Sequence, residues 1–441
     1  LIFRATSYLV KKITYFLFFV VTFAFGQEPD YVAPYAHFIT PEFLIGNPIA
    51  PTEYFPEADL GKAYFINIGR FYDKNDPEWA YRTGYARTGV SLGVTNYGNM
   101  EDLGRSYTIM PFTEFNLLGS KRLKVYAGMG TSRFTEKYQK RLNPFNDAIT
   151  TDFVWSFKLF VHFSIVKSDS FAWNLGAGYF HHSNGHVKLP NLGLNSLLAS
   201  TSFEFNYGES KRTIPEDYVP KKYKRTVQNY FQLRRGFGVN SLSEDFNQKK
   251  LVSTTHITFG KIYNRTFKFG VGFYYRHYAH YYDYIVNNED LIDELYPYFL
   301  DDPKAYAKNY GFSFDTEILM NHIGLECNIG FNIYKPFYKV DRMVSGSYTY
   351  IVQTGNGPVA IFEYGKLDGE YEIKRSISTR LGLKYYLLPT KEAPQHNIFF
   401  GATINSNAGQ ADFSEFSLGY VYRYNFKERG EKGDDLEPYT D

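Results

Sequence analysis

Apolar and polar residues alternate along most of this chain, in short runs separated by polar or glycine-containing stretches. Successive side chains of a β-strand point to opposite faces, so this period of two predicts strands that are apolar on one face only. We expect about 16 such strands. They span residues 36–46, 61–71, 88–97, 105–117, 121–134, 152–166, 171–183, 192–207, 226–242, 250–262, 266–285, 311–319, 323–334, 371–387, 396–406 and 413–426.

The connections between these predicted strands differ in length according to their order. Short connections follow even-numbered strands, at residues 119–120, 167–170, 263–265 and 320–322; long ones follow odd-numbered strands, at residues 135–151, 286–310 and 335–370. Outer-membrane barrels have short periplasmic turns and longer external loops. The pattern therefore places the loop after the seventh strand on the external side, with residues 72–87 and 208–225 as long exceptions.

Composition narrows the fold class. Aromatic residues make up 19% of the chain, with 41 Tyr and 41 Phe, although the mean hydropathy is −0.37. Strands that are apolar on one side and rims rich in aromatic residues produce this combination in a transmembrane antiparallel β-barrel. We expect such an all-β fold. The net charge of +2 does not suggest a nucleic-acid partner, and a single cysteine, Cys327, excludes an intramolecular disulfide.

The number of barrels is left open by a polar, proline-containing stretch, residues 208–225, that follows the eighth predicted strand. One wide barrel of about 14–16 strands is the favoured architecture, because tandem membrane barrels are unusual. The alternative is an eight-stranded barrel, residues 36–207, followed by a second barrel-like half. In that case the polar stretch is the linker.

Both termini lie outside the predicted barrel, which covers residues 27–426. Basic residues precede an apolar run, residues 13–25, and a small-x-small site ends at Gly26. This order predicts a signal peptide of residues 1–26 that is cleaved near Gly26, and hence export to the outer membrane of a Gram-negative bacterium. Residues 427–441 are charged and predict a disordered periplasmic tail.

Polar side chains interrupt the apolar face of the two strands that flank the seventh loop. His181 and Ser183 lie two residues apart, so they share a face with a Cα separation of about 6–7 Å. Asn195 shares the corresponding face of the next strand with Leu197 and Phe203. A histidine base, a serine nucleophile and an asparagine that orients the base form an ester-hydrolysing relay. Its apolar surroundings suggest a lipid substrate.

The residues around this relay form a longer motif, made of His181, Ser183, Asn184, Pro190, Asn191, Gly193 and Asn195. The motif resembles the H-x-S-N and P-N-x-G-x-E signatures of the PagL-type lipid A 3-O-deacylases, which lie on the last two strands of an eight-stranded outer-membrane barrel. The resemblance implies that residues 36–207 are a deacylase part, with His181 as general base and Ser183 as nucleophile. It places Asn184 or Asn191 near the oxyanion. Asn195 stands where the family has an acidic residue.

The function implied by this resemblance is that of a serine esterase that removes the 3-O-linked acyl chain of lipid A. Its partner is lipopolysaccharide in the outer leaflet, and the reaction needs no cofactor and no metal. A metal site at His181, His182 and His186 is disfavoured because His182 points to the opposite face and the loop has no carboxylate. The alternatives are a non-catalytic porin or uptake channel with a deacylase-like hairpin, and a phospholipase. The sequence sets no oligomeric state.

Overall fold

A computed structural model describes residues 37–72, 77–117, 120, 122–207, 223–354 and 357–429. The predicted signal peptide, residues 1–26, lies outside these residues, as do most of the linker stretch and the tail from residue 430. The last strand continues to Arg429, so the predicted start of the tail at residue 427 falls within a strand.

The first eight strands form one closed antiparallel barrel, in which each strand pairs with its sequence neighbours and β8 returns to pair with β1. A short helix, α2 (Glu78–Arg82), follows β2. The strands are β1 (His37–Ile49), β2 (Gly61–Arg70), β3 (Arg87–Asn96), β4 (Arg105–Asn116), β5 (Leu123–Phe134), β6 (Phe153–Lys167), β7 (Phe171–Ser183) and β8 (Leu194–Tyr207).

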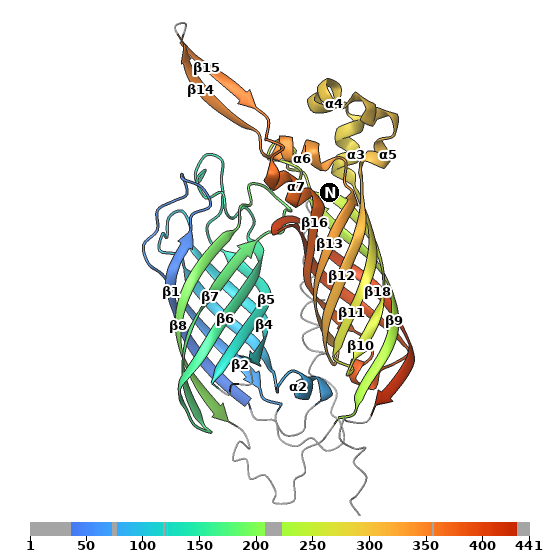
Figure 1. The fold of residues 1–441 in the computed structure, drawn as a ribbon. Coiled ribbons are helices and arrows are strands. Elements are labelled where there is room, and N and C mark those ends of the chain that lie inside the picture. Colours follow the sequence, from blue (N-terminus) through green and yellow to red (C-terminus); the bar gives the residue numbers. More distant parts are fainter. Residues whose placement is uncertain are drawn as a thin grey trace, which may run out of the picture.

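Eight further strands form a second closed barrel, in which β9 pairs with both β10 and β18. Figure 1 shows the two barrels side by side, with the N-terminal barrel in blue and green. The strands of the C-terminal barrel are β9 (Arg225–Asn240), β10 (Lys250–Tyr263), β11 (Phe267–Tyr278), β12 (Lys308–Met320), β13 (Ile323–Tyr334), β16 (Ile377–Tyr386), β17 (His396–Asn407) and β18 (Gln410–Arg429).

The all-β barrel class is confirmed, but the favoured single barrel of about 14–16 strands is wrong. The structure has the alternative architecture, an eight-stranded barrel followed by a second one. Local alternation cannot distinguish the two, because it is the same in both. The difference lies in which strands pair over long range, since β8 bonds to β1 and does not continue into β9.

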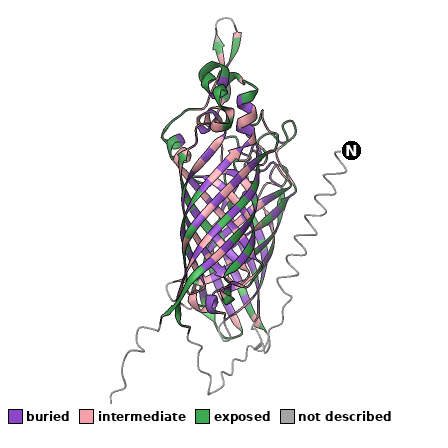
Figure 2. Cartoon of the chain, turned by 90° about the vertical axis from the view of Figure 1, so that its right-hand side faces the viewer, coloured by how far each residue is buried: buried purple, intermediate pink, exposed green. Residues whose placement is uncertain are grey.

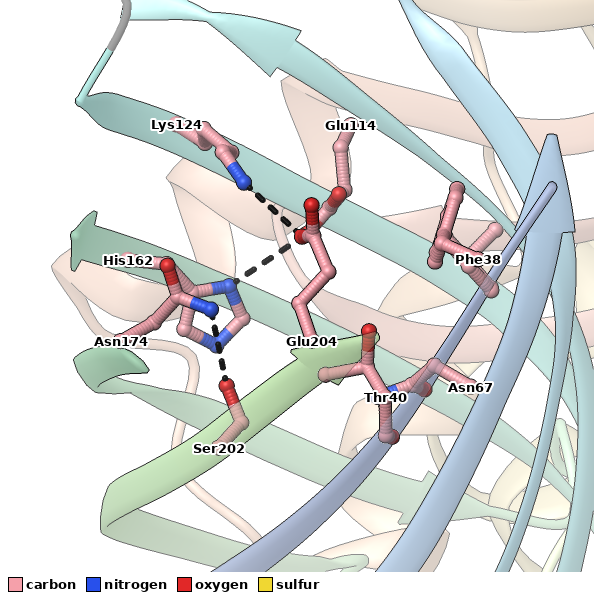
Figure 3. A pocket seen from close by; sticks show the side chains of 10 residues that line it. Phe38, Thr40, Asn67, Glu114, Lys124, His162, Asn174, Ser202 and Glu204 are labelled. Atoms are coloured by element: carbon pink, nitrogen blue, oxygen red, sulfur yellow. Dashed lines mark hydrogen bonds and ion pairs between the residues drawn. The ribbon is translucent and has the colours of Figure 1, made fainter. Parts of the chain in front are cut away.

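The lumen of the N-terminal barrel is filled by buried charged and polar side chains. Glu42 accepts hydrogen bonds from Lys158 and His162 at 2.5 and 3.1 Å. Farther along the lumen, Glu204 pairs with Arg87 at 2.8 Å and with Lys124 at 3.2 Å. Figure 3 shows that the side chains lining the remaining pocket converge on one another from several strands. An eight-stranded barrel is just wide enough for such filling.

The C-terminal barrel is filled in the same way by a second network. Arg234 and Lys384 pair with Glu326 at 3.0 and 2.8 Å, and Lys384 and Lys268 pair with Glu317 at 2.8 and 2.9 Å. Unpaired charges in such a position would be costly, and Arg234, Lys384 and Lys268 each have a carboxylate partner. An eight-stranded barrel has an interior that side chains can fill, unlike the aqueous channel of a porin with about 16–18 strands.

Buried and exposed residues alternate along the barrel strands in view in Figure 2, and many of the exposed ones are large apolar side chains. Exposed side chains of the N-terminal barrel include Leu175, Leu197, Phe203 and Phe205. Within the described residues, no helix is both long enough and apolar enough to cross a bilayer.

Helices cover one end of the C-terminal barrel, and a two-stranded hairpin projects beyond them (Figure 1). Two predicted strand ends are wrong where these helices begin or end. The strand expected at 266–285 stops at Tyr278, and residues 371–376 of the strand expected at 371–387 are helical. Tyr278, Tyr281 and Tyr284 are buried under this cap. The elements are α3 (Ala279–Val286), α4 (Asp290–Leu295), η2 (Pro297–Asp301), α5 (Pro303–Tyr306), α6 (Tyr338–Ser345), α7 (Gly369–Ser376), β14 (Tyr348–Thr354) and β15 (Gly357–Glu363).

The two barrels touch at both ends. At the end that holds α2, Arg82 donates hydrogen bonds to the backbone oxygens of Tyr223 and Lys224 at 2.8 and 2.9 Å. At the other end, the loop between β7 and β8 contacts the rim of the C-terminal barrel, where Ser241 donates its backbone N–H to the oxygen of His186 at 2.8 Å. This second contact involves the loop that carries the predicted motif.

Candidate active site

The predicted relay lies at the end of the N-terminal barrel where β7 and β8 meet. His181 stands opposite Asn195 in the β7–β8 pair, and Ser183 stands opposite Trp155 in the β6–β7 pair. Strand register therefore brings the three predicted residues to one rim of the barrel. Because β7 alternates between lumen and exterior, His181 points outward while its neighbour His182 fills the lumen.

His181 is held by the amide oxygen of Asn195. The Nδ1 atom of His181 lies 2.6 Å from Oδ1 of Asn195, which also accepts a hydrogen bond from the hydroxyl of Tyr179 at 2.5 Å. Since an amide oxygen only accepts, Nδ1 carries the proton, and the other ring nitrogen, Nε2, has the free lone pair that a base requires.

The hydroxyl of Ser183 is held separately, by its own loop. Its Oγ accepts hydrogen bonds from Nδ2 of Asn191 at 2.9 Å and from the backbone N–H of Gly185 at 3.1 Å. Asn191 also accepts a hydrogen bond from the backbone N–H of Asn184 at 2.9 Å. Two donors thus converge on the serine oxygen, and the side chain is only 3% exposed.

Between His181 and Ser183, both of which the structure describes, no hydrogen bond is formed. The serine hydroxyl is turned toward Asn191, whereas His181 packs beside Tyr179 with ring centroids 6.1 Å apart. Positions i and i+2 of a strand lie about 6–7 Å apart at Cα, so the two side chains are neighbours on one face of β7.

The loop of residues 184–193 has an internal frame. The side chain of Asn184 donates to the backbone oxygen of Lys188 at 2.7 Å and accepts from the N–H of Val187 at 3.1 Å. Both ends of this amide are therefore used to close the loop. Of the two predicted oxyanion residues, only Asn191 has a donor directed at Ser183.

The second half of the loop is fastened to its own barrel by the connection between β5 and β6. The hydroxyl of Thr150 donates to the oxygen of Pro190, and the oxygens of Asp147 and Ala148 accept from Leu192 and Gly193 at 3.1 and 3.3 Å. Burial raises the pKa of the Asp147 carboxyl, and a hydrogen bond from Thr52 opposes that shift.

The other histidines of the motif have structural partners. His182 lies between the hydroxyls of Tyr97 and Ser156, at 2.9 and 2.8 Å, and is fully buried in the lumen. Burial lowers the pKa of His186, a shift that the carboxylate of Asp412 opposes. Among the described residues, no group of three or more His, Cys, Asp or Glu side chains is arranged to hold a metal ion.

Apolar side chains surround the relay on the barrel exterior. Leu197, opposite Tyr179 in the strand pair, is 61% exposed, and Ile49, opposite Asn195, is 46% exposed. Leu192 of the loop is also exposed. The hydrogen-bonded polar groups therefore lie at the edge of an exposed apolar surface.

Two groups of residues were missing from the sequence interpretation. One is Tyr179, which bonds to Asn195 and whose spacing of two from His181 in the sequence was the available signal. Ser241, Asn247 and Ser414 contact the loop from the second barrel, and nothing in the local sequence marks them.

A closed barrel with a charged, filled lumen and an apolar exterior is a membrane β-barrel. Residues 63–204 match the lipid A 3-O-deacylase (PagL) family, so the predicted resemblance is confirmed for this part of the chain. The match lies within the N-terminal barrel and covers less than half of the chain. A membrane barrel with such a domain is an outer-membrane protein. No curated protein matches the chain.

Similar solved structures include the outer membrane enzyme PagL, at 16% identity, covering 37% of this chain and 97% of that chain with a TM-score of 0.27. The chain is also similar to Pseudomonas putida OprB, at 10% identity over 89% of this chain and 94% of that one, with a TM-score of 0.16. Pseudomonas aeruginosa OccK5 (OpdH) has 10% identity over 88% and 97%, with a TM-score of 0.19.

Proposed function

We propose that this protein is a serine esterase that removes the 3-O-linked acyl chain from lipid A of lipopolysaccharide in the outer leaflet. The observation that carries the proposal is the hydrogen bond between Nδ1 of His181 and Oδ1 of Asn195, on the rim where Ser183 lies. This bond leaves Nε2 free to act as a base on the side of the strand that also carries Ser183. The predicted signal peptide, cleaved near Gly26, would deliver the chain to that membrane.

In the proposed reaction, Nε2 of His181 takes the proton of Ser183 as Oγ attacks the ester carbonyl carbon. The Oγ–C bond forms and the carbonyl electrons move to the oxygen. When the tetrahedral intermediate collapses, the bond to the sugar oxygen breaks and His181 returns its proton to that leaving group. Water then attacks the acyl-enzyme by the same route and regenerates Ser183. The neutral amide of Asn195 orients the imidazole throughout.

The oxyanion would be stabilised by the two donors that now hold the serine oxygen. Nδ2 of Asn191 and the N–H of Gly185 lie within 3.1 Å of Oγ. When the serine side chain rotates toward His181, both donors lose their present acceptor and are free for the carbonyl oxygen. Donors fixed before the reaction stabilise developing negative charge without further reorganisation.

The substrate class is supported by the surface around the relay. The exposed side chains of Leu197, Ile49 and Leu192 border a site whose ester-cleaving groups lie at a barrel rim. An acyl chain lying along the barrel exterior would keep its ester near the water boundary, level with His181. A phospholipid ester would meet the same apolar wall, so substrate assays separate the two lipids.

The channel alternative receives no support from the interior. Ion pairs fill both lumens, for example Lys158 with Glu42 and Arg234 with Glu326. A wide porin requires far more strands in one ring than the eight in each barrel here.

The test is mass spectrometry of lipid A from cells that produce the wild type, Ser183→Ala or His181→Ala. A matched control is Ser170→Ala, an exposed serine at the opposite end of the same barrel. Loss of one hydroxyacyl chain with the wild type and the control, but not with the two site variants, is expected. Unchanged lipid A in cells whose outer membrane contains folded wild-type protein would refute the function.

A further inference from the structure

The loop of residues 184–193 is held by both barrels, half by each. Its second half is fastened to the N-terminal barrel through Thr150, Asp147 and Ala148, as described above. Its first half bonds to the C-terminal barrel. There Asn247, in the connection between β9 and β10, donates Nδ2 to the oxygen of Leu189 at 2.6 Å and accepts from the N–H of Leu189 at 2.8 Å.

Ser241, at the end of β9, makes the next contact along the loop. Its backbone N–H donates to the oxygen of His186 at 2.8 Å, and its hydroxyl donates to the oxygen of Val187 at 3.1 Å. His186 has φ +66°, a left-handed conformation that a residue with a side chain rarely adopts without support. The hydrogen bonds from Ser241 supply that support.

Ser414, on β18, bonds to two neighbours of Ser183, one on the adjacent strand and one two residues farther along the chain. Its Oγ accepts from Nε1 of Trp155, the strand partner of Ser183, at 2.9 Å, and donates to the oxygen of Gly185 at 3.4 Å. A Cβ atom on Gly185 would lie 2.1 Å from Oγ of Ser414, so the two barrels approach as closely as a glycine allows. The second barrel thus contacts two neighbours of the serine, Trp155 and Gly185.

These contacts fix the part of the loop that carries the hydrogen-bond donors to the hydroxyl of Ser183. The N–H of Gly185 is one of the two donors to Oγ of Ser183, and Asn191, the other, lies at the far end of the same loop. A change in the path of residues 185–189 therefore moves the N–H of Gly185 directly. It also changes the course of the chain that leads to Asn191, the second donor.

We propose that the C-terminal barrel is a positioning element of the deacylase site, with Ser241, Asn247 and Ser414 as its positioning residues. They fix the loop so that the donors on Gly185 and Asn191 converge on Ser183. The inference rests on the proposed function for the reaction, while the bracing of the loop is a physical property that can be measured without it.

The experiment compares the full-length wild type with Asn247→Ala, Ser414→Ala and the double variant, purified in detergent. Arg82→Ala is the matched control, because it removes hydrogen bonds between α2 and the segment that leads into β9 at the opposite end and does not touch the loop. Each protein is checked for folding by heat-modifiable electrophoretic mobility. Release of fatty acid from purified lipid A in mixed micelles gives kcat and KM, and hydrogen–deuterium exchange reports on residues 184–193.

We expect the double variant to lose between about 10-fold and 100-fold in kcat with little change in KM, because displaced catalytic groups slow the reaction step. Its loop amides should exchange faster, above all that of Leu189, while Arg82→Ala behaves as the wild type. The inference would be overturned if the loop amides of the double variant exchanged as in the wild type, or if its kcat were unchanged despite faster exchange. An equal loss of kcat in Arg82→Ala would overturn it as well. A wild type that releases no fatty acid refutes the proposed function. The exchange data then decide only whether the C-terminal barrel fixes the loop of residues 184–193.

Discussion

The amide oxygen of Asn195 is an acceptor shared by His181 and Tyr179. A carboxylate at this position would stabilise the imidazolium by charge as well as by hydrogen bonding. The neutral amide provides only the second effect, and the hydroxyl of Tyr179 fixes the amide so that its oxygen faces the ring. In the proposed mechanism, the pair Tyr179–Asn195 therefore orients the base, and its loss should slow the chemical step without weakening substrate binding.

Substitution of the two residues should have graded effects on deacylation. Tyr179→Phe removes one neutral hydrogen bond worth about 0.5–1.5 kcal/mol, so kcat should fall about threefold. Asn195→Leu leaves the Nδ1 proton without an acceptor and should lower kcat between about 10-fold and 100-fold. Asn195→Asp should raise kcat, because both donors are kept and the acceptor becomes charged.

The measurement is the initial rate of fatty-acid release from lipid A micelles, with Tyr207→Phe on the same barrel exterior as control. A wild-type rate in Asn195→Leu would contradict the role of this residue, and the orienting group would then have to come from elsewhere.

The common location of His181, Ser183 and Asn195 at one rim could be predicted because a strand period of two is short-range information. It puts His181 and Ser183 on one face, and the hairpin puts Asn195 beside them. The contacts of the loop with Ser241, Asn247 and Ser414 could not be predicted, since they depend on how two barrels pack. The orientation of the Ser183 hydroxyl toward Asn191 could not be predicted either, because side-chain rotamers follow from packing.

At the scale of the elements, the loop between β7 and β8 depends on glycines at two points. Gly185 and Gly193 have φ +68° and +78°, values that favour glycine. Gly193 also lies against His181, where a Cβ atom would be 3.0 Å from the Cε1 atom of the ring. A Cβ atom on Gly185 would be closer still to its neighbour, at 2.1 Å from Oγ of Ser414, which belongs to the other barrel.

Gly185→Ala should lower deacylation strongly. The new methyl group would collide with Ser414 while the left-handed backbone adds strain of about 1 kcal/mol. Combining it with Ser414→Gly should restore part of the activity, since that removes the clash and leaves only the strain. The rates of the two variants are compared in the lipid A assay. If Ser414→Gly gives no recovery, the approach of the barrels does not determine the loop.

The helical cap of the C-terminal barrel holds a carboxyl group with an altered pKa. Asp341, on α6, accepts a hydrogen bond from Tyr281 at 2.7 Å, and burial raises its pKa to about 6 from 3.8, against the opposing effects of Tyr281 and Lys335. A carboxyl whose pKa is higher in the folded state favours folding below its ordinary pKa. That contribution is lost as the pH rises through about 6.

Asp341→Asn should therefore stabilise the cap at pH 8, by on the order of 2 kcal/mol, and change little near pH 4. The neutral amide keeps an acceptor for Tyr281 without burying a charge. Hydrogen exchange of α6 at pH 4 and pH 8 measures the effect, with the exposed Asp290→Asn as control. An equal difference at both pH values would show that titration of Asp341 is not the cause.

The cap also shows why the strand predicted at residues 266–285 ends at Tyr278. Tyr281 and Tyr284 continue the run of aromatic residues from β11, and such residues favour strands. In the structure they turn into a helix because they pack against Phe337 and the rest of the cap. Tertiary packing therefore decided the conformation against the local preference.

At the scale of the whole molecule, the chain uses sixteen barrel strands to make two filled barrels where one open barrel was favoured. Each lumen carries its own matched set of charges, such as Arg87 with Glu204 in the first and Arg380 with Glu415 in the second. A single wide barrel would hold these side chains around a water-filled interior, where they would need no close partner. The sequence contained the charges but not their pairing.

The full-length protein should accordingly form no steady channel in planar lipid bilayers. Side chains fill an eight-stranded ring, and opening a path would require separating buried pairs such as Lys384 with Glu317 and Glu326, whose disruption leaves uncompensated charge. A wide porin reconstituted under the same conditions is the positive control. Stable conductance steps of porin size, increasing in number with the amount of folded protein, would contradict the filled lumens. Conductance no greater than that of a protein-free bilayer, from a sample that deacylates lipid A, is the expected result, because a folded and active protein with filled lumens conducts no ions.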